Sequence, residues 1–167
     1  MTPLPGRLGG GEIVAWRIDE ARHAATWNSG EGARLVGGRW NSVGVRAVYC
    51  AIDPATAIVE VAVHKGFDTL DTKPHVLTSL QVSPAAPLHI VGPGDVPNPN
   101  WLRPGTVTTG QQQFGDALLR QHPFVLIPSV VSSHSWNLIF DSTVAAGHYT
   151  LLGQERLAID PRLATRS

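Results

Sequence analysis

The sequence has a single cysteine, no net charge and no long hydrophobic run, and each of these absences excludes a class of protein. Cys50 is the only cysteine in 167 residues, so neither an internal disulfide nor a zinc cluster built on thiolates can form. Basic and acidic residues balance at 13 each, so no global field draws the chain to nucleic acid or to an anionic membrane. No segment approaches the ~20 consecutive apolar residues of a membrane span.

Motifs for common cofactors and metals are missing as well. There is no Walker A loop and no G-x-G-x-x-G, and none of the seven histidines has H-E-x-x-H or another ligand spacing, so we expect no metal. The first residues, MTPLPGRLGGGE, lack the apolar core of a signal peptide, and we expect a cytoplasmic protein. Cys50 lies in the apolar run AVYCA, which favours a buried, inert thiol over a nucleophile.

What is present indicates one folded domain. The chain is 43% hydrophobic and 16% charged, which suffices for a core. We expect a flexible segment over 1–11 and a domain over 12–167. Alternation and β-branched residues predict the following strands: 12–18, 45–51, 75–82, 87–91, 124–133 with an interruption at Pro128, 135–141, and one or two over 149–159.

Helices are fewer than strands in this prediction. Asp53 as N-cap, Pro54 in the first turn and Gly66 after the end predict a helix over 54–65, and a second is expected over 111–122. The segment 19–38 is expected to be loop or short helix. Because strands and helices do not alternate regularly, the pattern favours an α+β fold, a single compact domain of short mixed or antiparallel strands.

Glu60 is the first candidate for chemistry, because it is the one charge inside the apolar stretch AIVEVAV. A carboxylate shut away from water needs a cationic partner to stay ionised, whereas a glutamate at the helix edge would simply reach solvent. His64 follows one turn later, where a hydrogen bond between the two is favoured over a metal pair.

Two arginines and a serine complete the candidates. Arg39 stands in GGRWN, where glycines permit a tight turn and a guanidinium can bind an anion beside an aromatic wall. Arg17 ends the first predicted strand and by itself would be a surface charge. Ser129 follows Pro128 in an apolar strand, where it can bond a ligand or satisfy backbone at a bulge. No G-x-S-x-G surrounds it, which disfavours a serine hydrolase.

Taken in order, four segments resemble one family. They are WRI at 16–18, GARLVGGRWNSVGVRAVYCA at 32–51, DPATAIVEVAVH at 53–64 and FVLIPSVV at 124–131. This pattern is similar to the RES-domain family, the toxins of bacterial RES–Xre toxin–antitoxin pairs, which is named for an arginine, a glutamate and a serine. The matching positions are Arg39, Glu60 and Ser129, and Arg17 matches a second arginine of the family's pocket.

The resemblance implies a fold similar to ADP-ribosyltransferases and a cleft that consumes NAD⁺, with no resident cofactor. It implies that the nicotinamide–ribose bond breaks and that phosphate, water or a protein side chain accepts the ADP-ribose. It also implies a cognate antitoxin with an Xre-like DNA-binding domain, whose carboxy-terminal segment plugs the site. No direct contact with nucleic acid or membrane is expected.

The chain departs from the family pattern at two places. Ile18 stands where members often carry a tyrosine, and we predict Trp40 and Tyr49 as substitutes that bind the nicotinamide or its ribose. The segment IFDS at 139–142 replaces a frequent Asn-Pro, which we interpret as a change in a structural turn.

The chemistry of NAD⁺ cleavage fits these residue types. Breaking the bond leaves an oxocarbenium-like ribose, which Glu60 would stabilise, as a carboxylate does in glycoside hydrolysis. Arg17 and Arg39 would clamp the diphosphate, and Ser129 would form a hydrogen-bonding wall. Because the fixed positive charge also attracts phosphate, we expect phosphorolysis before hydrolysis.

Three other functions remain as alternatives. The chain could transfer ADP-ribose to a specific protein, or it could be an inactive RES fold that only binds its antitoxin. The presence of all four chemical types argues against the inactive fold. An RNA-cleaving toxin is disfavoured by the neutral charge and by the lack of a basic, aromatic stripe.

Overall fold

A computed structural model describes residues 12–103, 105, 107–132 and 134–163. The predicted flexible segment 1–11 lies outside these residues. The strands are β1 (Ile13–Glu20), β2 (Val48–Ala51), β3 (His75–Val82), β4 (Leu88–Ile90), β5 (Phe124–Pro128), β6 (Trp136–Phe140) and β7 (Tyr149–Arg156). The helices are α1 (Glu31–Val36), α2 (Pro54–Lys65), α3 (Phe67–Thr72) and α4 (Thr109–Gln121), with 3-10 turns η1 (Ala21–Thr26), η2 (Pro93–Asp95) and η3 (Pro161–Leu163).

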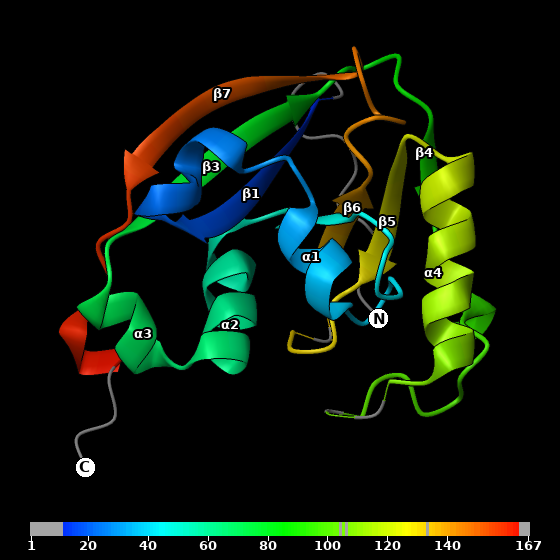
Figure 1. Ribbon diagram of the computed structural model, residues 1–167, viewed down its shortest axis with the longest axis horizontal. Helices are drawn as coiled ribbons and strands as arrows, with labels where there is room; N and C mark the ends of the chain where they lie inside the picture. Colours follow the sequence, from blue (N-terminus) through cyan, green and yellow to red (C-terminus); the bar gives the residue numbers. More distant parts are fainter. Residues whose placement is uncertain (1–11, 104, 106, 133, 164–167) are drawn as a thin grey trace.

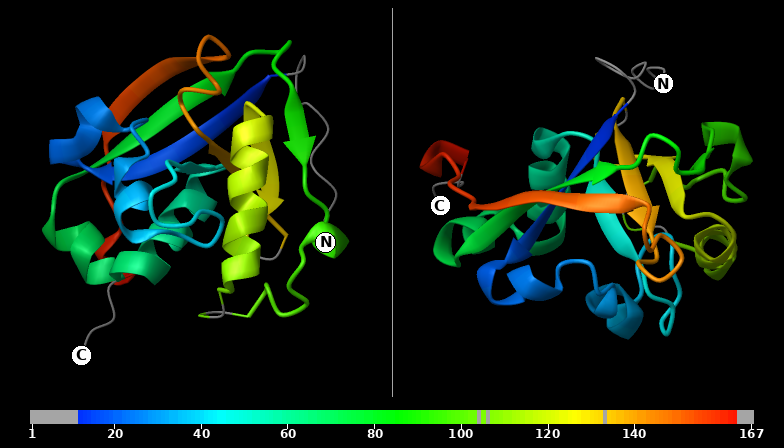
Figure 2. Two further views of the ribbon diagram at one scale, coloured as in Figure 1. Left: turned by 45° about the vertical axis from the view of Figure 1, so that its right-hand side comes forward. Right: turned by 90° about the horizontal axis from the view of Figure 1, so that it is seen from above.

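All seven strands form one mixed sheet in the order β4-β5-β6-β2-β1-β3-β7. Only the pair β4–β5 is parallel, and the other pairs are antiparallel. The long strands β1, β3 and β7 run across the top of the molecule while β5 and β6 run down it, so the sheet is strongly twisted (Figure 1). Figure 2 gives two further views of this twist. The predicted α+β class, a single domain of short mixed strands, is confirmed.

Capping residues and strand alternation in the sequence predicted the bounds of two elements correctly. Helix α2 and strand β3 have the predicted bounds, and in α2 the Asp53 carboxylate accepts a hydrogen bond from the Thr56 backbone N–H at 2.8 Å. The predicted strand 124–133 is too long, because β5 ends at Pro128, a residue that cannot donate to the ladder. Helix α3 was not predicted.

The sheet opens between β1 and β2. These strands pair at a single position, Trp16 opposite Ala51, after which they diverge. Continued pairing would set Ile18 opposite Tyr49, but here the Arg17 side chain donates through Nη1 to the Tyr49 carbonyl at 3.0 Å. The Arg17 side chain thus satisfies the Tyr49 carbonyl, which has no partner in the sheet at this point. The widening gap between β1 and β2 makes room for a site.

Helices cover the two halves of the sheet on either side of this gap. Ala57 and Ala62 of α2 pack with Ile18 and Leu77, and Figure 1 shows α2 beneath β1. Leu118 and Leu119 of α4 pack in a second cluster against β5 and β6. A membrane-crossing helix, which must be long and apolar, does not occur in the described part of the chain.

Candidate active site

A cavity of about 280 Å³ lies where β1 and β2 diverge, between α2 and the loop that follows α1. The structure brings five of the six predicted site residues into its lining: Arg17, Arg39, Trp40, Tyr49 and Glu60. Ser129 is the exception, since it is fully buried and does not belong to the lining. Two residues that the sequence analysis did not single out, Asp19 and Asn137, also line the cavity.

Glu60 is half-buried on the face of α2 that lines the cavity. Its Oε1 accepts two hydrogen bonds, from Ser129 Oγ at 2.8 Å and from Asn137 Nδ2 at 2.6 Å. No hydrogen bond from a described residue reaches the other oxygen, Oε2. The carboxylate is therefore anchored at one oxygen and available at the other.

Ser129 supports Glu60 from behind. It follows the last residue of β5, and its Oγ accepts a hydrogen bond from the Ser132 backbone N–H at 3.1 Å while donating to Glu60. The serine therefore both satisfies backbone and holds the carboxylate. Ser129 was expected to form a hydrogen-bonding wall of the cavity. Its side chain instead lies behind Glu60 and contacts that carboxylate, not the open space.

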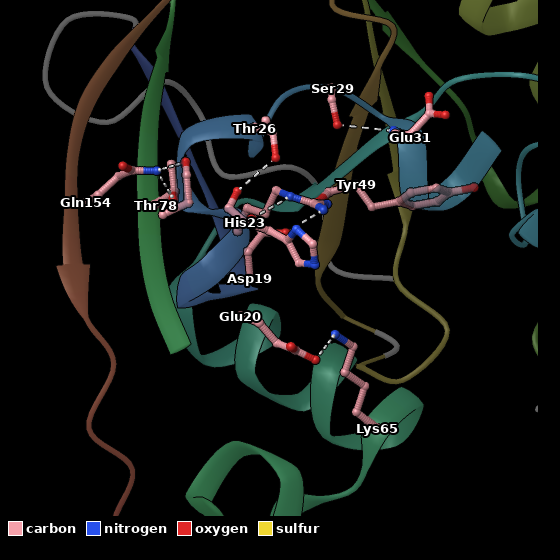
Figure 3. A network of polar contacts seen from close by, with 12 residues as sticks. Asp19, Glu20, His23, Thr26, Ser29, Glu31, Tyr49, Lys65, Thr78 and Gln154 are labelled. Carbon is pink, nitrogen blue, oxygen red and sulfur yellow. Dashed lines mark hydrogen bonds and ion pairs between the residues drawn. The ribbon is translucent and has the colours of Figure 1, made fainter. Parts of the chain in front are cut away.

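The predicted hydrogen bond between Glu60 and His64 does not form in the described structure. His64 is exposed and lines the cavity further along α2, next to Lys65. The Lys65 ammonium stands 3.8 Å from the Glu20 carboxylate, and Figure 3 shows this pair facing each other below Asp19 and Tyr49. A lysine at this position adds a solvent-facing positive charge to the cavity's edge.

The GGRWN loop is built around its glycines. Gly37 has φ +74°, and a Cβ on Gly38 would stand 2.6 Å from Asn41 Oδ1 and 2.7 Å from the Tyr49 hydroxyl. The tight turn is closed by a bridge between Gly38 and Asn41. It presents Arg39 to the cavity, where Nη1 donates to the Trp101 carbonyl at 3.1 Å. Burial lowers the pKa of Arg39 from its ordinary value, and the nearby Glu60 charge opposes that shift.

Tyr49 holds this loop in place. Its hydroxyl accepts from the Trp40 backbone N–H at 3.0 Å and donates to Asn41 Oδ1 at 2.7 Å. Burial raises the pKa of the phenol, so it stays a neutral donor. Trp40 is 2% exposed, and its ring packs against that of Trp101, with ring centroids 5.9 Å apart. Both residues therefore have a packing duty in the loop, and their contact with substrate stays a prediction.

A polar face of α4 clamps the same loop from the other side. Gln112 Nε2 donates to the Gly38 carbonyl at 2.9 Å, and Asp116 accepts from the Ser42 backbone N–H at 2.9 Å. Gly115 lies between them, where a Cβ would stand only 2.0 Å from the Trp40 carbonyl oxygen. The close approach of helix and loop explains why a glycine occurs inside this helix.

Arg17 is fixed by an acid that sequence reasoning missed. Its Nε and Nη2 donate to the two carboxylate oxygens of Asp19 at 2.9 and 2.7 Å, a bidentate pair in a half-buried setting. The signal was available, because residues i and i+2 of a strand share a face. Asn137 also left a signal, as the one amide in the buried, apolar strand β6.

Comparison with known proteins identifies the family of this chain. The RES domain family matches residues 14–160. The chain belongs to the RES domain family. A curated relative from Photorhabdus laumondii, "Toxin Res", is 29% identical over 154 residues, which are 90% of this chain and 97% of the relative. A second, "Prs ADP-ribosylating toxin" from a Sphingobium species, is 32% identical over 133 residues, 75% of this chain and 80% of the relative.

The fold of this RES-domain protein also has a solved counterpart. A chain in the crystal structure of the M. tuberculosis MbcT–MbcA toxin–antitoxin complex superposes with a TM-score of 0.70. The superposition covers 87% of this chain and 84% of the other at 22% identity, which establishes the fold.

Two further residues of the cavity lining, Ile18 and Cys50, are buried. Cys50 is buried, as predicted, and burial raises the pKa of its thiol to about 12. Ile18, at the position where the family often has tyrosine, packs in the core between β1 and α2. Within the described residues, no group of three or more histidine, cysteine or acidic side chains is placed to hold a metal ion.

Proposed function

We propose that this RES-domain protein is the toxin of a toxin–antitoxin pair and that it cleaves NAD⁺ at the nicotinamide–ribose bond. The observation that carries the proposal is the Glu60 carboxylate, anchored at Oε1 and open at Oε2, in the same cavity as Arg39 and Arg17. One anionic oxygen with two cationic groups nearby suits a substrate whose reacting sugar becomes positive and whose diphosphate is negative.

In the proposed reaction the C–N bond breaks and its electron pair leaves with nicotinamide. The anomeric carbon becomes electron-poor, and Glu60 Oε2 stabilises it or holds the ribose hydroxyls. An acceptor oxygen then bonds to that carbon. With phosphate as acceptor the product is ADP-ribose phosphate, and with water it is ADP-ribose and a proton.

The two arginines contribute differently to diphosphate binding. Arg39 has a neutral carbonyl as its hydrogen-bond partner, so its charge is available to an anion. Arg17 uses three of its five N–H groups on Asp19 and Tyr49, which leaves two for a ligand and cancels much of its charge. We therefore assign the main phosphate contact to Arg39 and a directional contact to Arg17.

A second candidate is the transfer of ADP-ribose to a protein. It is favoured by the name of the Sphingobium relative, an ADP-ribosylating toxin, to which this chain is 32% identical. The bond broken and the role of Glu60 are the same in both reactions, and only the acceptor differs. The partner we propose is an antitoxin that covers the cavity, since the structural counterpart comes from a toxin–antitoxin complex. An Xre-like DNA-binding domain in that antitoxin is part of the proposal.

The test is product analysis with purified protein. NAD⁺ is incubated with and without phosphate, and the products are separated by chromatography. We expect free nicotinamide in both cases and a phosphate-dependent rate with ADP-ribose phosphate as the main product. Equal rates with ADP-ribose as the sole product would defeat phosphorolysis, and intact NAD⁺ would defeat the proposed function. Labelled NAD⁺ in a cell lysate tests the second candidate, which predicts label on a discrete protein band.

A further inference from the structure

Asn137 lies in an interior strand of the sheet and contacts the one carboxylate of the proposed chemistry. It belongs to β6, where it pairs with Ala51 of β2 on one side and Ile127 of β5 on the other. Its side chain lines the cavity and donates through Nδ2 to Glu60 Oε1 at 2.6 Å. A residue held by two neighbouring strands has little freedom to move, so its amide is a fixed reference for the carboxylate.

Packing alone does not explain an asparagine at this position. Asn137 is 9% exposed in a strand whose other residues are all buried and apolar. Its Oδ1 is buried and accepts no hydrogen bond from any described residue, a rare state for a polar atom in a native protein. An apolar β-branched residue would fit the strand without that cost. The retained amide therefore points to a task that needs the Nδ2 donor.

The geometry indicates what the donor does. Ser129 and Asn137 approach the same oxygen of Glu60 from different elements, the end of β5 and the middle of β6. Two donors on one oxygen fix the rotation of the carboxylate and leave Oε2 for the substrate. Both donors are neutral, so they hold the carboxylate without adding a positive charge that would repel an electron-poor ribose.

We propose that Asn137 is a positioning residue for Glu60, which aims Oε2 at the reacting carbon of the nicotinamide-bearing ribose. This inference rests on the proposed function, because the position it fixes matters only for that bond. Asn137 acts through Glu60 and is not itself expected to contact the reacting atoms.

The test compares N137A and N137D with the wild type in NAD⁺ turnover. N137A loses the donor, and we expect kcat to fall about 10- to 100-fold while KM stays within about threefold, because the reacting geometry and not the binding is lost. N137D keeps the size but puts a second carboxylate against the first, and the two cannot both ionise easily. We expect the activity of N137D to rise with pH over a range in which the activity of the wild type no longer changes.

Asn28 provides the matched control, since it donates to the Tyr149 hydroxyl at 2.8 Å and lies outside the cavity. N28D should keep the wild-type rate and pH profile. Thermal unfolding identifies folded variants, and if N137A does not fold, the isosteric N137D carries the test through its pH profile. Wild-type kcat and pH profile in a folded variant would overturn the inference and leave the proposed function intact. Absence of NAD⁺ loss in the wild type would overturn both.

Discussion

Glu60 and Arg39 carry opposite charges in one cavity, yet they form no direct ion pair within the described structure. They influence each other through space, since the Glu60 charge opposes the lowering of the Arg39 pKa by burial. Each is held by neutral groups instead, Glu60 by a hydroxyl and an amide and Arg39 by a carbonyl. Charges held this way remain available to a ligand that carries both signs, as NAD⁺ does.

The first prediction concerns the charge on Glu60. Glu60→Gln keeps the shape of the side chain and removes the anion, so NAD⁺ loss should fall about 10²- to 10³-fold, the usual cost of one aimed electrostatic contact. Arg39→Ala should lower the rate of NAD⁺ loss by a similar factor. The rates are measured on purified proteins, with the exposed Glu155→Gln of β7 as control. Activity within a few-fold of the wild type would remove the residue concerned from the mechanism.

A second prediction concerns the Tyr49 hydroxyl. Tyr49→Phe leaves the Trp40 N–H and Asn41 Oδ1 without their shared partner, which should cost about 1–3 kcal/mol in the free energy of unfolding. Urea denaturation measures the change. The control is Tyr149→Phe, whose hydroxyl accepts one hydrogen bond from Asn28 in a half-buried position. Equal losses of stability in the two variants would contradict the role of the Tyr49 hydroxyl in holding the GGRWN loop.

Helix α4 has a role that its own sequence pattern does not reveal. Its apolar residues pack on the sheet, but Gln112 and Asp116 reach backbone groups of the GGRWN loop. Gly115 permits the helix to approach the loop at Trp40. The helix therefore acts as a clamp on the segment that presents Arg39.

The clamp leads to a third prediction, in which a helix-favouring substitution destabilises. Gly115→Ala should gain about 1 kcal/mol in helix propensity, but its Cβ would meet the Trp40 carbonyl oxygen at 2.0 Å. The clash forces helix and loop apart, and we expect a net loss of about 1–3 kcal/mol in the free energy of unfolding. Gly110→Ala in the same helix is the matched control, because its nearest neighbour is 4.0 Å away. Equal or higher stability of Gly115→Ala would contradict the described contact.

Elements with local boundary signals could be predicted from the sequence, and contacts between elements could not. Asp53, Pro54 and Gly66 define α2 within the chain itself, so its bounds were predicted correctly. Helix α3 begins directly after Gly66 and has no such start, and it depends on packing of Leu70 against α2. The end of β5 could have been predicted at Pro128, had the missing N–H been given more weight than the apolar run.

The site shows the same distinction between local signals, which the sequence contains, and contacts between distant elements, which it does not. The resemblance to the RES-domain family implied that Arg17, Arg39 and Glu60 line one site, and the cavity brings them together. The partners of these residues follow from strand order, which one sequence does not reveal. Asn137 meets Glu60 only because β6 lies beside β2. The opening between β1 and β2, which creates the cavity, is likewise a property of the assembled sheet.

The stability of the whole domain should depend on pH through a pair of stacked histidines. His89 of β4 and His122 at the end of α4 have ring centroids 4.2 Å apart and are nearly parallel. Burial and the neighbouring His89 lower the pKa of His122 below its ordinary value of about 6.5. Below that value the unfolded chain binds a proton that the folded chain resists, so stability is complete above about pH 7.5 and falls as the pH drops toward the folded pKa.

We therefore expect the urea midpoint of the wild type to fall between pH 7.5 and pH 5.5, and His122→Gln to reduce this fall because the resisting group is gone. His89→Gln should reduce it in part, since burial of His122 remains. Replacement of the exposed His23 serves as the control and should leave the slope unchanged. The linkage would be contradicted if His122→Gln lost stability over this range as steeply as the wild type, because acid-sensitive groups elsewhere would then account for the whole effect.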